Sequence, residues 1–164
     1  MRKTAFTFSL LLALTVAALA ATAESPETRV VPRVVYGAME GRFTFTGPWE
    51  GPWTAIGDVK GPLRHLGLAK MTTTHTSYPD GTISGGQFTI VAANGDELRG
   101  SYTASGGWIS DTQVLGTAEF VIEGGTGRFA QATGDITAGF LETLDDPTWA
   151  SAKVNWTLEG TVLY

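Results

Sequence analysis

The 164-residue chain contains 21 glycines and seven prolines but no cysteine, and its formal net charge is −5. Hydrophobic residues make up 43% of the chain and charged residues 16%, which excludes a disordered polyanion and a coiled coil. Without cysteine there is no disulfide framework, no thiolate metal site, no cysteine nucleophile and no lipidated N-terminal cysteine. At this length we expect one domain.

Residues 1–23 have the pattern of a secretory signal peptide. Arg2 and Lys3 give a short cationic start, and an uncharged apolar stretch follows. Small residues that fit the cleavage pattern end at Ala20 and at Ala23. A membrane anchor is the alternative, but the apolar stretch is shorter than the roughly 20 residues that a helical span needs. The sequence therefore predicts a secreted or periplasmic protein with no helical membrane span in the mature chain.

The mature chain is expected to be acidic. Removing Arg2 and Lys3 from the 11 Lys and Arg leaves nine, against 16 Asp and Glu, so the formal net charge becomes −7. An acidic surface repels the phosphate backbone, and the sequence contains no basic run. Nucleic acid is therefore not an expected partner.

Strand-like segments follow a polar stretch at 24–33, which we expect to be a flexible lead-in. The expected strands cover 34–46, 55–60, 65–77, 84–93, 96–104, 115–123, 133–142 and 149–163. Turn signals separate them, including Gly61-Pro62 and Gly106-Gly107, and no interval has a helical period of ten or more residues. This pattern predicts one all-β domain over 34–164, built as an antiparallel sandwich or barrel.

The hairpin around Asn94-Gly95 indicates which side chains face inward. A two-residue loop would mix polar and apolar residues on each face. A three-residue loop over 93–95 pairs Ala92 with Asp96, separates the two faces, and places Gly95 where a left-handed conformation is needed. The apolar face then contains Phe88, Ile90, Leu98 and Tyr102.

Later strands also have one apolar face each, which fits a sheet closed around an apolar interior. Closure of about eight strands would also remove exposed sheet edges. The expected lining of a ligand cavity is Phe88, Ile90, Leu98, Tyr102, Phe120, Phe140 and Trp156. The same pattern fits an ordinary filled core, so both interpretations stay open.

Residues 124–134 form a glycine-rich segment, GGTGRFAQATG, between two expected strands. It lacks the Lys-Ser/Thr ending of a phosphate loop, and no helix follows it. We therefore expect a structural connection in which Phe129 plugs one end of the barrel. The glycines of this structural loop are Gly124, Gly125, Gly127 and Gly134.

This segment and the preceding strand, 117–123, resemble the corresponding region of the plant dirigent and allene oxide cyclase families. Residues 65–67 and 88–98 resemble small secreted bacterial members of the same barrel superfamily, and the likeness covers about 65–142. The resemblance implies a calycin-type, eight-stranded antiparallel closed barrel with an apolar cavity, as a possible homodimer or homotrimer. The plant catalytic carboxylates match no position here, so the resemblance implies no catalytic residue.

Two side chains are candidates for acid–base chemistry. Glu142 shares its parity with Phe140, so a buried position would raise its pKa, although a strand end can also expose it. His65 could act at a cavity mouth, or it could be a surface or hydrogen-bonded histidine. His65 and His75 would lie about 33 Å apart along a regular strand, so we expect no shared metal site and no cofactor.

Three hypotheses for function follow from these observations. The first is a secreted barrel that binds a small hydrophobic molecule, apolar or aromatic, in its interior. The second is a cyclase or isomerase that shapes a hydrophobic substrate in the cavity, with Glu142 or His65 as the acid–base group. The third is an eight-stranded outer-membrane barrel, which would require apolar faces that point outward.

Overall fold

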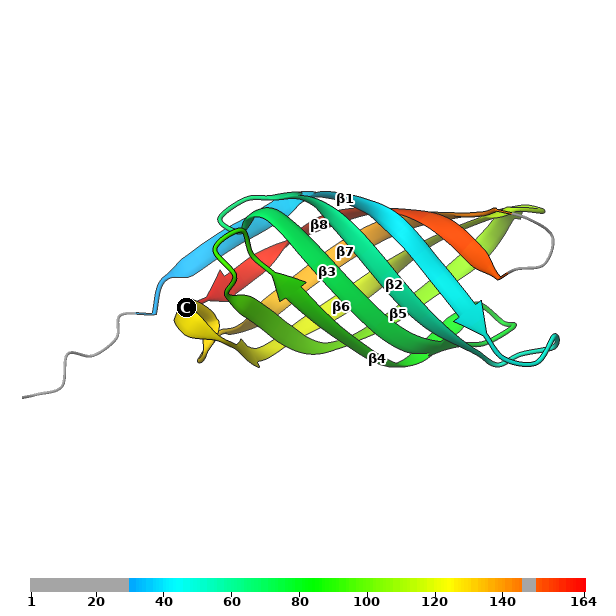
Figure 1. Ribbon diagram of the computed structural model, residues 1–164, viewed down its shortest axis with the longest axis horizontal. Coiled ribbons are helices and arrows are strands. Elements are labelled where there is room, and N and C mark those ends of the chain that lie inside the picture. Colours follow the sequence, from blue (N-terminus) through cyan, green and yellow to red (C-terminus); the bar gives the residue numbers. More distant parts are fainter. Residues whose placement is uncertain (1–29, 146–149) are drawn as a thin grey trace, which may run out of the picture.

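The computed structural model describes residues 30–145 and 150–164, which form a closed barrel of eight antiparallel strands (Figure 1). The elements are β1 (Pro32–Thr46), β2 (Trp53–Leu63), β3 (Gly67–Ser77), β4 (Thr82–Val91), β5 (Glu97–Ser110), β6 (Gln113–Gly125), the 3₁₀ turn η1 (Gly127–Phe129), β7 (Thr133–Leu144) and β8 (Ser151–Leu163). Each strand pairs with its neighbours in sequence, and β1 pairs with β8 to close the barrel. The all-β closed-barrel prediction is confirmed. The expected signal peptide and most of the lead-in lie outside the described residues, and β1 begins at Pro32.

All eight expected strands are present, but three turn signals lie inside strands: Gly61-Pro62, Gly106-Gly107 and Gly124-Gly125, the last of which ends β6. Gly61-Pro62 belongs to β2. Position 61 needs glycine because β1 passes so close that a Cβ there would lie 2.0 Å from the Ala38 carbonyl oxygen. Gly106-Gly107 belongs to β5, which continues to Ser110 before the chain turns. Gly61 and Gly106 therefore permit close contact with a neighbouring strand rather than a turn, whereas a Cβ on Gly107 would meet no atom within 4 Å.

The interior of the barrel is filled by apolar side chains from alternating positions of every strand. Phe120 lies at the centre, and its ring contacts those of Phe88, Tyr102 and Trp156 at centroid distances of 5.2, 4.9 and 5.6 Å. The outward positions between the buried ones are mostly exposed and include Lys60, Lys70 and Glu119. This orientation is opposite to the one that an outer-membrane barrel would require. No helix among the described residues is long and apolar enough to cross a membrane.

The predicted hairpin register between β4 and β5 is confirmed. The Ala92 amide donates to the Asp96 carbonyl at 2.9 Å, and Gly95 has a φ of 88°. Ile90 pairs with Leu98 directly below the loop, and both side chains are fully buried. Burial therefore selects the three-residue loop.

The glycine-rich segment closes one end of the barrel, at the left of Figure 1. Phe129 is completely buried there, and its ring contacts that of Tyr164 at 4.7 Å. The Arg128 guanidinium lies over both rings and donates a hydrogen bond to the His65 carbonyl oxygen. Gly127 has a φ of 53°, a left-handed conformation that favours glycine, and a Cβ there would lie 1.9 Å from the Asp96 carboxylate, which would have to move. These contacts plug this end of the barrel, which leaves the opposite end for a binding site.

Candidate ligand pocket at the open end

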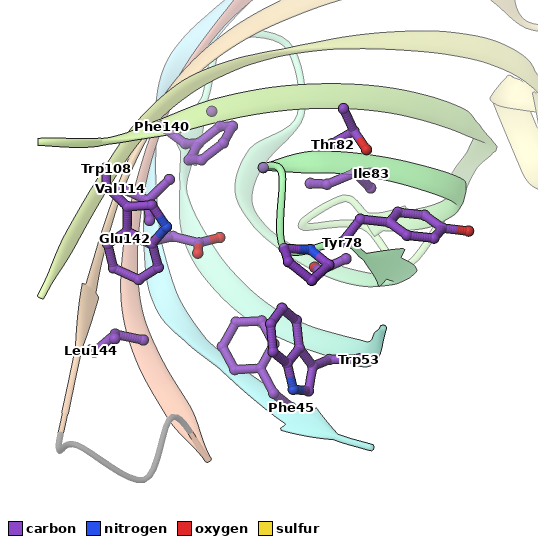
Figure 2. A pocket seen from close by; sticks show the side chains of 14 residues that line it. Phe45, Trp53, Tyr78, Thr82, Ile83, Trp108, Val114, Phe140, Glu142 and Leu144 are labelled. Carbon is purple, nitrogen blue, oxygen red and sulfur yellow. The ribbon is translucent and has the colours of Figure 1, made fainter. Parts of the chain in front are cut away.

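A pocket of about 180 Å³ lies at the end of the barrel opposite the Phe129 plug. Five aromatic side chains line it: Phe45 from β1, Trp53 from β2, Tyr78 from the turn after β3, Trp108 from β5 and Phe140 from β7. Figure 2 shows Trp53 and Phe45 on one side, with Phe140 and Trp108 across the space from them. The pocket is therefore mainly apolar and aromatic.

Glu142 is the acidic side chain that lines this pocket, and Figure 2 shows its carboxyl group directed into the space. Its position follows from the alternation of β7, in which Ile136, Ala138 and Phe140 also face inward. Glu142 stays partly exposed, but enough protein surrounds the carboxyl group that burial raises its pKa to about 7. Both the neutral acid and the carboxylate are therefore present near neutral pH.

A hydrogen-bonded chain of three polar side chains begins at the pocket wall and continues into the core. Ser77 lines the pocket, and its Oγ hydrogen-bonds His75 Nε2 at 2.9 Å. On the other side of the ring, His75 Nδ1 hydrogen-bonds the Tyr102 hydroxyl group. Burial lowers the pKa of His75 to about 4 and raises the pKa of Tyr102 well above its usual range. At neutral pH His75 is therefore uncharged, and its Nε2 can either donate a hydrogen bond to Ser77 or accept one from it.

The two predicted acid–base candidates lie at opposite ends of the barrel. Glu142 is at the open end, whereas His65 is exposed in the turn between β2 and β3, beside the plug, with a φ of 67°. His65 therefore takes no part in this pocket. His75, rather than His65, is the histidine next to it. Across the described ranges, no group of three or more His, Cys, Asp or Glu side chains could hold a metal ion.

The seven residues expected to line a cavity divide into one pocket residue and six core residues. Phe140 lines the pocket at the open end. The other six are at most 3% exposed and pack below it: Phe88, Ile90, Leu98, Tyr102, Phe120 and Trp156. The expected glycine loop is shorter than predicted: Gly127 begins η1, whereas Gly124 and Gly125 end β6 and Gly134 belongs to β7, all at the plugged end. The apolar faces thus build a filled middle, and the space for a ligand lies at one end.

Most of the pocket residues could not be recognised from the sequence. Trp53 and Tyr78 lie at or just beyond strand ends, where alternation no longer indicates direction. Trp108 follows Gly106-Gly107, which looked like a turn but belongs to the long strand β5. The signal that was available is the high tryptophan content close to expected turns.

No family model matches the sequence, and no curated protein matches it. Among solved structures, the chain is similar to the pterocarpan synthase dirigent protein GePTS1, with 20% sequence identity and a TM-score of 0.48. The alignment covers 81% of this chain and 86% of that chain. The match is to a dirigent protein, one of the families that the glycine-rich segment resembles, and at this similarity it transfers no substrate or activity.

Proposed function

We propose that the barrel binds a small apolar or aromatic molecule in the pocket at its open end. The observation that carries this proposal is the combination of an apolar middle that is already filled and an aromatic pocket of about 180 Å³ above it. Concave, mostly apolar pockets with a few polar groups are the usual form of small-molecule sites. An apolar cavity of about 150 Å³ can hold benzene, so this pocket suits a ligand with one ring.

Binding can be measured by titrating the protein with toluene and following tryptophan fluorescence. Trp53 and Trp108 line the pocket, so we expect a saturable change in their emission. Val114→Phe fills the pocket from β6 and is expected to weaken toluene binding at least tenfold. Val121→Phe is the matched control, because Val121 lies on the same strand but is 47% exposed on the outer face. Absence of saturable binding to the wild-type protein would show that the proposal is wrong.

A second candidate function, a cyclase or isomerase, is supported by Glu142. A carboxyl group with a pKa of about 7 can both donate and accept a proton near neutral pH. In such a reaction the aromatic walls would orient the substrate, and Glu142 would protonate or deprotonate it. An enzyme would turn over a substrate, and Glu142→Gln would abolish that turnover but keep toluene binding. A protein that only binds its ligand would show no turnover.

We also propose that the protein is exported and that its signal peptide is removed. The cationic start, the apolar stretch and the small residues before positions 21 and 24 support this proposal. Protein recovered from the extracytoplasmic fraction of its host is expected to begin at Ala21 or Glu24, as intact-mass measurement would show. A chain that keeps residues 1–23 would contradict this prediction.

The homodimer or homotrimer that the resemblance implies stays a prediction. Leu68 on β3 and Leu115 on β6 point outward and are 69% and 54% exposed. Both side chains line a hollow of about 750 Å³ that spans β3, β2, β1, β8, β7 and β6. This surface is suitable for contact with a second copy of the chain.

A further inference from the structure

We propose that the pocket at the open end selects an organic cation, a small ammonium compound with an apolar or aromatic body. This inference rests on the proposed binding function and specifies the chemical class of the ligand. It is carried by two features of the same pocket: aromatic rings from several strands, and a carboxyl group among them.

The first feature is the set of aromatic walls. An aromatic ring has a negative face, which attracts a cation within about 6 Å of its centroid, and tryptophan does so most strongly. Trp53 and Trp108 lie on different walls of the pocket, with Phe45 on the side of Trp53 and Phe140 on the side of Trp108 (Figure 2). Rings on several sides of one small space form the arrangement that recognises ammonium groups.

The second feature is the charge of the pocket. Glu142 is the one acidic residue among its lining residues, and no lysine or arginine is found among those lining residues that the structure describes. On the neighbouring strands, Glu142 pairs with Val114 and Val154, neither of which can balance a negative charge. An ionised Glu142 would therefore be desolvated without a cationic partner, and a bound ammonium group would supply that partner.

The other ionisable groups near the pocket do not provide a positive charge. Tyr78 lines the pocket from the β3–β4 turn, and Tyr102 lies behind it on β5. His75 on β3 stands behind Ser77, and its pKa of about 4 leaves it neutral at physiological pH. An anionic ligand would thus meet aromatic faces and a carboxyl group, and no described lining residue would supply a compensating positive charge, so the pocket disfavours anions.

The test compares two ligands of the same shape, phenyltrimethylammonium and tert-butylbenzene, by tryptophan fluorescence. We define the cation preference as the affinity for phenyltrimethylammonium divided by that for tert-butylbenzene. At pH 8 this preference is expected to be at least tenfold higher in the wild-type protein than in Glu142→Gln. In the wild-type protein it should fall about tenfold between pH 8 and pH 6, because Glu142 becomes protonated. Glu119→Gln, the same change at an exposed outward position, should leave the preference unchanged.

Two results would overturn the inference, and they differ in what they say about the pocket. If both ligands bind but neither Glu142→Gln nor the change of pH alters the preference, the pocket takes neutral aromatic molecules, and the proposed binding function stands. If neither ligand binds to the wild-type protein, the proposed binding function is itself wrong. The pH series in the wild-type protein keeps the test decisive even if Glu142→Gln does not fold.

Discussion

Replacing Phe120 with alanine is expected to lower the free energy of unfolding by about 3–5 kcal/mol. Phe120 is 1% exposed and lies where rings from β4, β5 and β8 meet. Removing its ring would leave a cavity that the closed barrel cannot easily collapse, because hydrogen-bonded strands surround it on all sides. Urea denaturation of the wild-type and variant proteins would measure the difference.

Val121→Ala is the control for this prediction, since Val121 is the next residue on β6 and points outward. Its effect should not exceed about 1 kcal/mol, the range of strand propensities. Equal losses for Phe120→Ala and Val121→Ala would show that the interior is not the packed core described above.

Glu142 and His75 are expected to give the unfolding free energy two opposing dependences on pH. Burial raises the pKa of Glu142 from 4.5 to about 7, so the folded protein binds its proton more tightly. The contribution of Glu142 is fully present below about pH 4.5 and is lost as the pH rises through about 7. Burial lowers the pKa of His75 from 6.5 to about 4, so its contribution is present above pH 6.5 and is lost as the pH falls through about 4.

Both contributions change between about pH 4.5 and 6.5. As the pH rises through this window, the contribution of Glu142 decreases and that of His75 increases. A pKa change of this size corresponds to about 3 kcal/mol for buried His75, and to less for Glu142, which is partly exposed. Compared with wild type, Glu142→Gln should therefore gain stability more steeply as the pH rises across this window. His75→Asn should gain it less steeply.

Chemical denaturation at several pH values between 4 and 8 would measure these slopes. The slope is the relevant quantity, because His75→Asn also removes hydrogen bonds to Ser77 and Tyr102 and should be less stable at every pH. If both variants keep the wild-type slope, burial does not control these two groups.

The strands could be predicted from the sequence because each one alternates between a buried and an exposed face. The β4–β5 hairpin is the clearest case, since a one-residue shift would have turned Phe88 and Ile90 toward solvent. The ends of strands were harder to predict. Gly61-Pro62 and Gly106-Gly107 carry the composition of turns, but they continue strands, because a neighbouring backbone comes too close for a side chain or the hairpin extends past them.

The pocket was only partly predictable for the same reason. Phe140 lies within the regular part of β7, so its parity indicated that it faces inward. Glu142 shares that parity but was the last residue of the expected strand, so its direction stayed open until the structure extended β7 to Leu144. Trp53, Tyr78 and Trp108 meet only when the barrel closes and brings β2, the β3–β4 turn and β5 around one opening. No local sequence pattern indicates that these three side chains lie around the same opening. The role of His75 was missed because the sequence does not show that Tyr102, 27 residues later, would reach its ring.

The order of the strands has a consequence for how the chain assembles. Seven of the eight strand pairings join consecutive strands, and one, between β1 and β8, joins the two ends of the sheet. The first seven can form as local hairpins with short loops, whereas the last must close a ring that spans the whole domain. At this seam the Val31 amide donates to the Tyr164 carbonyl oxygen at 3.1 Å. A circularly permuted chain, linked at the seam and opened at another turn, would keep all eight pairings and move the ring-closing step to a different pair of strands.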